Sequence, residues 1–270
     1  MINKIDVYNC SSEDLPLKNN DVVLIAKTKN EYKRIPFFIQ YYRMIGIKYF
    51  IFIDNNSSDD TYEFLLKQGN TKVFFTTDAL PNHHLWIKKI LDTFCINRWS
   101  LIVDLDELFC FSNIESVKIN RIIEYLDLKG YDAVSSILLD MYPRGFLSKA
   151  VVKDEYSPLS LLQFFDKNSH FLKYNKHYGG VRKRIFDVEP CLTKFPLIKH
   201  NPNIIIGPGM HSVKNITPAK FSTALLHCKF DSNFKTKTEQ AVESAVYWNN
   251  SEEYKKYAEK YKYKEELASQ

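Results

Sequence analysis

Short apolar runs alternate with helix-like stretches through the first half of the chain, and this alternation limits the fold more than any other feature. Each run has the length of one strand and is rich in β-branched or aromatic residues. The expected strands are Asp21–Lys27, Lys48–Asp54, Lys72–Thr77, Trp99–Leu105 and Asp132–Leu139. The expected helices are a segment from Pro36 to Ile45, Asp59–Gln68 capped by Ser58, His83–Asn97 and Asn120–Leu128. This order predicts parallel βαβ units, and therefore an α/β fold with a mixed, mostly parallel sheet and helices on both faces.

Polar side chains gather where the expected strands end. Lys29–Glu31 follows the first strand, Asp54–Asn55 closes the second, and Asp104–Glu107 closes the fourth. Ligands of parallel sheets bind at the carboxyl ends of the strands, so we expect these residues and Asp140 to share one rim. The chain has neither G-x-G-x-x-G nor a P-loop motif, which argues against both a Rossmann dinucleotide site and a P-loop.

The fourth of these strand ends, D-L-D-E, carries three carboxylates directly after an apolar run. Burying unpaired carboxylates costs several kcal/mol, so a cation is the first candidate to compensate them. If the strand continues through Leu105, alternation places Asp104 and Asp106 on the same side. Two such carboxylates can hold Mg²⁺ or Mn²⁺ that also binds substrate phosphates. The alternative is an acidic surface turn. Glu107 either orients a metal-bound water or faces solvent.

Composition narrows the class of protein. The 270 residues are 45% hydrophobic, which is enough for a sizeable core, and the formal charge of +5 is too small to indicate a nucleic-acid partner. No apolar run of 18 residues occurs, and the first twenty residues lack a signal-peptide pattern. The five cysteines are widely spaced without a C-x-x-C pair, which predicts reduced thiols and a cytoplasmic protein.

Three motifs in order resemble the GT-A-fold glycosyltransferases. They are K-N-E at Lys29–Glu31, I-D-N-N-S-S-D-D-T at Ile53–Thr61 and W-S-L-I-V-D-L-D-E at Trp99–Glu107. The resemblance is to the family-2-like branch with a D-x-D-E signature, which is also similar to glycosyltransferase family 92. Later segments agree with it, namely Gly179–Phe186, Pro196–His200, Gly209–Ser212 and Ala224–Phe230. The resemblance covers about residues 21–235, with Asn56 standing where the family usually has glycine.

The resemblance implies a metal-dependent hexosyltransferase. Its donor would be a nucleotide-diphosphate sugar, with a UDP-sugar first, and its acceptor a hydroxyl of a saccharide or of a lipid-linked saccharide, as in polysaccharide or lipooligosaccharide biosynthesis. The resemblance also implies inversion at the sugar carbon and Mn²⁺ or Mg²⁺ as cofactor. Carried over residue by residue, it assigns the nucleobase and ribose to Asn30, Glu31, Asp54 and Asn55. It assigns the metal to Asp104, Asp106 and His227, with His211 as the competitor of His227.

Two further roles have several candidates. Arg182 and Arg184 lie beside a Gly-Gly pair and suit a diphosphate or an anionic acceptor, although a solvated basic strand face explains them equally well. If Val181–Phe186 is a strand, these arginines share one face. An inverting enzyme also needs a base for the acceptor hydroxyl. The candidates, in order, are Asp140, Asp166 and His211.

The chain is expected to form a GT-A-like domain over residues 1–235 and a helical extension over residues 236–270. Tyr254, Tyr257 and Tyr261 recur at helical spacing within Glu252–Glu266 and predict an aromatic stripe that packs on the domain. The minority interpretation is that the stripe docks on a partner or on the inner face of a membrane that holds a lipid-linked acceptor.

Three other classes compete with the glycosyltransferase. A nucleotidyltransferase would use the same acidic strand end, but it usually needs a glycine-rich basic loop, and Ala26–Glu31 contains no glycine. A phosphodiesterase more often shows dense clusters of His and Asp. A non-catalytic nucleotide-sugar-binding domain would need no residues to stabilise a leaving diphosphate.

Overall fold

The computed structural model describes most of the chain. The described residues are 8–9, 15–18, 20–78, 83–152, 157–245, 248–261 and 267. They form two compact units. Unit one comprises Met1–Leu105, Phe109–Ser136 and Lys194–Thr223, and unit two comprises Asp106–Leu108, Ile137–Thr193 and Ala224–Gln270.

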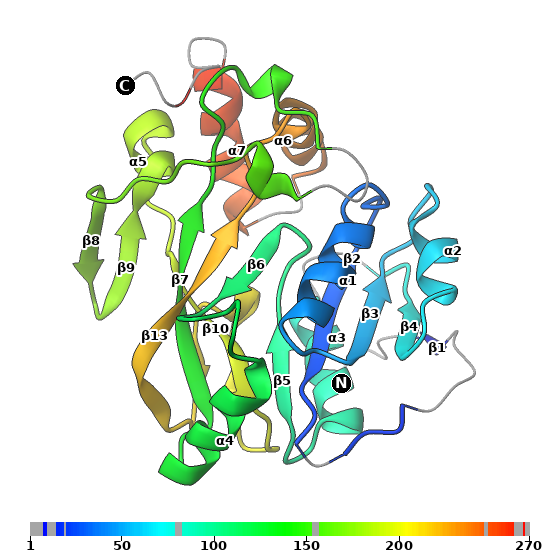
Figure 1. The fold of residues 1–270 in the computed structure, drawn as a ribbon. Helices are drawn as coiled ribbons and strands as arrows, with labels where there is room; N and C mark the ends of the chain where they lie inside the picture. Colours follow the sequence, from blue (N-terminus) through cyan, green and yellow to red (C-terminus); the bar gives the residue numbers. More distant parts are fainter. Residues whose placement is uncertain are drawn as a thin grey trace. The chain divides into compact units, whose positions relative to one another are not determined.

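A nine-stranded sheet runs in the order β1-β4-β3-β2-β5-β10-β7-β13-β6 (Figure 1). Its strands are β1 (Tyr8–Asn9), β2 (Val23–Thr28), β3 (Tyr49–Asp54), β4 (Thr71–Phe75), β5 (Trp99–Ile102), β6 (Glu107–Cys110), β7 (Ala133–Asp140), β10 (Thr193–Lys199) and β13 (Pro218–His227). Strands β4, β3, β2 and β5 run parallel to one another. Strand β1 is antiparallel to β4, and β10 is antiparallel to β5. Unit one contains all or part of every strand, and one end of β6, β7, β10 and β13 belongs to unit two. The predicted α/β class with a mixed, mostly parallel sheet is confirmed.

Helices cover both faces of the parallel strands in unit one. These helices are α1 (Ile35–Met44), α2 (Thr61–Leu66), α3 (His83–Phe94) and α4 (Ile119–Lys129). On one face, Ile25 and Ile51 belong to the same buried cluster as Trp86 of α3. On the other face, Phe52 of β3 approaches Phe38 of α1, with ring centroids 6.2 Å apart. Successive residues of β3 therefore serve opposite layers, which explains why all six of its side chains are buried.

The predicted helices form with shifted ends. Pro36 lies in the first turn of α1, and Gly46, with φ 106°, follows its end as expected. The second helix is shorter than predicted because its N-cap is Asp60 and not Ser58. Ser58 instead donates its backbone N–H and its hydroxyl to the side-chain oxygen of Asn30. Unit one is completed by the strands β11 (Ile205–Ile206) and β12 (Val213–Lys214) and by the turn η4 (Pro208–Met210).

Unit two has its own aromatic core. Its elements are the turns η2 (Leu147–Lys149) and η3 (Pro158–Ser160), the hairpin β8 (His170–Lys173) and β9 (Lys176–Gly179), and the helices α5 (Gly180–Phe186), α6 (Phe234–Ser244) and α7 (Trp248–Tyr261). Tyr257 of α7 is fully buried, and its ring centroid lies 4.9 Å from that of Phe186 and 5.3 Å from that of Phe234. Complete burial of one such ring contributes roughly 1.5–3 kcal/mol.

The tyrosine stripe of the last helix packs as predicted, because Tyr254 and Tyr261 flank the buried Tyr257 in the same cluster. The end of the expected segment, residues 262–266, lies outside the described residues. The proposed boundary at residue 235 stays a prediction. Helices α6 and α7 belong to unit two together with Ile137–Thr193.

The structure corrects two expected strands. Val181–Phe186 is helical, because Val181 and Ile185 are one helical turn apart and both enter the core of unit two. Arg182 and Arg184 therefore do not share a strand face. The strand expected to reach Leu105 ends at Ile102, and a further strand, β6, starts at Glu107. Glu107 is buried, so the interpretation in which it faces solvent is wrong.

Other sequence-based expectations concern membranes and thiols. None of the described helices has the length and apolar composition that a membrane crossing requires. Four cysteines are free thiols in the described part of the chain, namely Cys95, Cys110, Cys191 and Cys228. Cys10 lies outside the described residues.

Candidate functional site

The carboxyl edge of the parallel strands in unit one carries Asp54 and Asp104. Strand β2 lies between β3 and β5 and runs parallel to both, so Asp54 at the end of β3 and Asp104 just beyond β5 lie at the same edge. Asp54 is fully buried, and it accepts hydrogen bonds from the backbone N–H and the hydroxyl of Ser57 (2.9 and 2.5 Å). Burial raises the pKa of Asp54 despite these hydrogen bonds.

The loops after β2 and β3 are tied to each other by side chains. The backbone N–H of Asn30 donates to the Ser57 hydroxyl (2.9 Å), and that of Glu31 donates to the Thr61 hydroxyl (2.9 Å). Asn55 donates its amide to the carbonyls of Thr76 (3.2 Å) and Asp78 (2.9 Å). The predicted nucleotide-binding residues of unit one are therefore held together in one preorganised loop pair.

Asn56, which stands where the family that the sequence resembles usually has glycine, has a left-handed backbone. Its φ is 57°, in the left-handed region that glycine adopts freely and asparagine adopts more readily than other residues. Asn30 also has a left-handed φ, of 55°. Asparagine at position 56 therefore suits the left-handed backbone that this turn requires.

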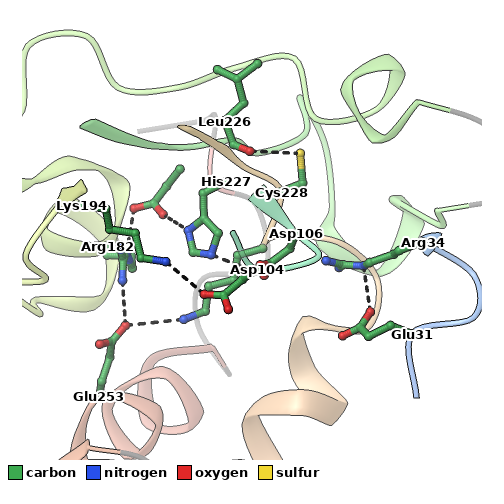
Figure 2. Close-up of polar contacts among 12 residues, drawn as sticks. Glu31, Arg34, Asp104, Asp106, Arg182, Lys194, Leu226, His227, Cys228 and Glu253 are labelled. Carbon is green, nitrogen blue, oxygen red and sulfur yellow. Dashed lines mark hydrogen bonds and ion pairs between the residues drawn. The ribbon is translucent and has the colours of Figure 1, made fainter. Parts of the chain in front are cut away.

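Asp104 is held between two lysines of unit one. Lys27, from β2, donates to Oδ1 of Asp104. Lys194, from β10, donates to Oδ2 at 3.0 Å (Figure 2). The Lys194 side chain is only 6% exposed, whereas that of Asp104 is 34% exposed. A buried ammonium requires a partner of opposite charge. Asp104 therefore offsets the cost of burying the Lys194 charge, in addition to any role toward a ligand.

Backbone pairing in unit two brings three predicted site residues together. Strand β7 ends at Asp140 and β13 ends at His227. The N–H of Met141 donates to the carbonyl of His227 (2.9 Å), and the N–H of Cys228 donates to the carbonyl of Asp106 (2.6 Å). The main chains of Asp140, His227 and Asp106 are thus side by side within this unit.

The side chains of these residues form a chain with His227 at its centre. Nδ1 of His227 lies 2.6 Å from Oδ1 of Asp140, and Nε2 lies 3.4 Å from Oδ2 of Asp106 (Figure 2). Burial alone would lower the pKa of His227, but the carboxylates of Asp106 and Asp140 outweigh it and raise that pKa to about 9. The imidazole is therefore fixed in orientation, with Nε2 directed at Asp106.

Arg182 completes the environment of Asp140. Its Nε donates to Oδ2 of Asp140 (2.7 Å) and its Nη1 donates to Oε1 of Glu253 (3.1 Å). Burial alone would raise the pKa of Asp140, but Arg182 and His227 hold it well below its usual range. Both oxygens of this carboxylate are engaged, which makes Asp140 a weak proton acceptor.

A second cation, Lys229, lies in the same unit. Its ammonium is 3.6 Å from Glu253 and 4.7 Å from the ring centroid of Tyr257. Burial lowers the pKa of Lys229, and this effect is larger than the opposing effect of Glu253. In unit two, Arg182 and Lys229 therefore belong to one network of charged side chains, joined by the Glu253 carboxylate of α7.

Asp166 and Arg184 form a separate pair in unit two. Arg184 donates through Nε (2.8 Å) and Nη2 (2.9 Å) to the two oxygens of Asp166, which also accepts hydrogen bonds from Tyr142 (2.7 Å) and Ser169 (3.0 Å). Burial alone would raise the pKa of Asp166, but these donors lower it. The structure therefore places Arg184 with Asp166, and Arg182 with Asp140.

His211, the third candidate base, belongs to unit one. It directly follows the turn η4, is partly buried, and has a φ of −73°. A Cβ atom on Gly209 would lie 2.9 Å from the His211 ring, so glycine lets the loop fold closely around this imidazole.

The described residues contain no group of three or more His, Cys, Asp or Glu side chains arranged to hold a metal ion. The pair that fits a cation is Asp106 with His227, because Asp140 orients the imidazole in the way that carboxylates orient metal-ligating histidines. The strand alternation expected to align Asp104 with Asp106 is wrong, because residues 103–106 form a loop and turn after β5.

The sequence did not single out Lys27, Lys194, Lys229 or Glu253. Lys27 and Lys194 carried a local signal, since each lies within a largely buried strand, β2 and β10. Lys229 follows His227 closely in sequence, but its partner Glu253 lies on α7. Pairings between residues so far apart in sequence have no local pattern.

Comparison with known proteins gives limited information. No family model matches the chain, and no curated protein matches it. Among solved structures, it is similar to one described as a glucose-1-phosphate thymidylyltransferase from Bacillus anthracis in complex with sucrose, with 10% identity and a TM-score of 0.31 over 50% of this chain and 64% of that chain. It is also similar to HddC from Yersinia pseudotuberculosis, with 11% identity and a TM-score of 0.32 over 66% of this chain and 73% of that chain. Such low superposition scores identify no activity for this chain.

Proposed function

We propose that the protein is a divalent-metal-dependent glycosyltransferase that moves a sugar from a nucleotide-diphosphate donor to an acceptor hydroxyl. The observation that carries this proposal is the orientation of His227 by Asp140 toward Asp106. A carboxylate and an oriented imidazole, both at strand ends, suit an ion that also binds diphosphate. The donor is proposed to be a UDP-sugar and the acceptor a saccharide or lipid-linked saccharide.

Asp106 and Nε2 of His227 would hold the cation, Mn²⁺ or Mg²⁺, which requires that the imidazolium first lose its Nε2 proton. When bound, the ion supplies positive charge against the diphosphate that departs. Asp140 acts on the histidine, not on substrate, since its oxygens are occupied by His227 and Arg182. Asp104 is retained as a predicted metal ligand, and it would have to exchange its contacts with Lys27 and Lys194 for the ion.

Unit one is proposed to bind the nucleoside. The buried carboxylate of Asp54 and the loop of Asn30 and Glu31 offer fixed acceptors and donors, which suit the polar edges of a base and a ribose. Asn55 stabilises this loop from within, because its amide is already bound to two carbonyls. A preorganised loop pair lowers the entropy cost of binding.

His211 stays a predicted candidate for the base that accepts the proton of the acceptor hydroxyl. Asp140 and Asp166 have lowered pKa values and engaged oxygens, so each would be a poor acceptor for the proton of a sugar hydroxyl. Arg184 is likewise held by Asp166, and we assign this pair to stabilising unit two.

The test is an assay of products with a panel of UDP-sugars and Mn²⁺, first without an acceptor and then with saccharide acceptors. Release of UDP that EDTA abolishes supports the proposal. Formation of UTP and sugar 1-phosphate when pyrophosphate is added would instead identify a nucleotidyltransferase. Binding of a UDP-sugar without any turnover would identify a non-catalytic binding domain.

The variants Asp106→Asn and Asp104→Asn separate the two predicted ligands. Each is expected to slow UDP release by roughly 10²–10³, the usual effect of losing one preorganised charge contact in a transition state. Asp187→Asn is the matched control, because it removes an exposed carboxylate from the end of α5. Wild-type rates in both Asp106→Asn and Asp104→Asn would refute a metal held by the D-L-D sequence.

A further inference from the structure

The tip of the hairpin β8–β9 in unit two has a strained backbone. Tyr174 and Asn175 form the connection between the two strands, and both have left-handed φ values, 51° and 58°. Two-residue hairpin loops of this kind favour Asn, Asp or Gly, and a tyrosine in this conformation is costly. The tyrosine is also 85% exposed, so no burial compensates for the strain.

The residues next to the tip also oppose folding. Lys173 and Lys176 are directly opposite each other in the strand register. Like charges in facing positions destabilise an antiparallel pair. The Lys173 ammonium lies 5.8 Å from the centroid of the exposed Tyr174 ring, and among the described residues neither lysine forms an ion pair with a carboxylate. Residues 167–178 include three lysines and two histidines but no Asp or Glu, so the whole hairpin is basic.

Apolar side chains extend from the same hairpin into solvent. Leu172 is 68% exposed and Phe171 is 38% exposed. Among the described rings, Phe171 stacks on Tyr178, the residue opposite it, with ring centroids 6.0 Å apart. Figure 1 shows the hairpin at the outer edge of unit two, where it leads into helix α5. Strain, like-charge pairing and exposed apolar area therefore coincide at one tip.

We propose that the β8–β9 tip docks on the surface of an anionic lipid bilayer. Leu172 and Tyr174 would enter the interfacial layer, where leucine and tyrosine side chains are both favourable. Lys173 and Lys176 would lie at the headgroups, whose negative charge removes the repulsion between them. Unlike an acidic protein surface, a bilayer explains the exposed leucine and tyrosine as well as the lysines.

This surface differs from the membrane contact considered from sequence. The tyrosine stripe of α7 packs into the core of unit two, so it is not available to contact a membrane. The hairpin proposal also does not depend on the glycosyltransferase activity, because none of its residues belongs to the proposed catalytic groups.

The test is co-sedimentation of the full chain with vesicles of phosphatidylcholine alone or mixed in equal parts with phosphatidylglycerol. The wild type is expected to bind the anionic vesicles and to be released by high salt. Leu172→Ser and Tyr174→Ser should each weaken binding roughly tenfold, and Lys173→Gln and Lys176→Gln about fivefold each. Circular dichroism verifies that each variant is folded.

The matched control is Leu128→Ser with Lys129→Gln, which changes an exposed leucine and lysine on α4 of unit one. This variant should bind vesicles as the wild type does. No binding of the wild type to anionic vesicles would overturn the proposal. It would also be overturned if the lysine variants lost binding while Leu172→Ser and Tyr174→Ser kept it, a result that would indicate charge attraction to the headgroups without entry of the apolar tip.

Discussion

Replacing Arg182 by methionine should strongly destabilise unit two. The Arg182 and Asp140 side chains are 7% and 2% exposed, and their ion pair is 2.7 Å long. Methionine fills much of the same volume but leaves the Asp140 carboxylate buried with His227 as its remaining ionic partner. Removing one member of a buried ion pair costs about 3–5 kcal/mol, a large part of the 5–15 kcal/mol that stabilises a typical protein.

The assay is urea unfolding followed by far-ultraviolet circular dichroism. Lys183→Met is the matched control, because Lys183 is the next residue of α5 but pairs with Asp187 and Glu189 at the surface. That control should leave the unfolding midpoint unchanged. Adding Asp140→Asn to Arg182→Met should recover part of the loss, because no uncompensated charge then remains. Equal stability of Arg182→Met and Lys183→Met would refute the reasoning.

Three further changes have defined outcomes. Asp166 has a pKa lowered from 3.8, so its contribution to stability is complete above about pH 4 and is lost as the pH falls. The urea unfolding midpoints of the wild type and of Asp166→Asn should therefore converge in acid. A difference between these midpoints that stays constant with pH would contradict this. Tyr174→Asn should raise the free energy of unfolding by about 0.5–1 kcal/mol, measured as a higher thermal midpoint, because asparagine tolerates the left-handed conformation better. Gly179→Ala should lower the free energy of unfolding by about 1–3 kcal/mol, because the φ of Gly179 is 108° and the new Cβ would lie 2.2 Å from the Ser169 carbonyl oxygen. Gly69→Ala is the control in the same thermal assay, because no atom lies within 4 Å of the new Cβ.

The central sheet of unit one could be predicted because its information is local. Strands such as β3 are continuous apolar runs bounded by polar turns, and helix α1 has Pro36 in its first turn and Gly46 just after its end. Sequence could not locate the end of β5, because Val103 and Leu105 continue the apolar pattern into a turn. The mistaken alignment of Asp104 with Asp106 follows from that single error.

The helix α5 shows the limit of reading short segments. Val181–Phe186 fits either a strand with alternating basic residues or a helix with Val181 and Ile185 on one side. The choice depends on the aromatic core contributed by α6 and α7, which lie far along the chain. Tertiary packing therefore decided the secondary structure.

The candidate site was partly accessible to sequence. Asp140 and His227 were identifiable because each ends an apolar strand. Their mutual hydrogen bond and the ion pair between Asp140 and Arg182 could not be identified from sequence. His227 and Arg182 lie 87 and 42 positions from Asp140 and meet it only in the folded unit. On these contacts we propose that Asp140 orients the His227 imidazole, whereas the sequence made it the first candidate base.

Binding of Mn²⁺ in the presence of UDP tests the central claim most directly, with free Mn²⁺ followed by electron paramagnetic resonance. The account predicts a Mn²⁺ site in the wild type that is weakened at least tenfold by Asp106→Asn and by His227→Gln, while Asp187→Asn binds normally. Equal Mn²⁺ affinity in the wild type and in both Asp106→Asn and His227→Gln would contradict it.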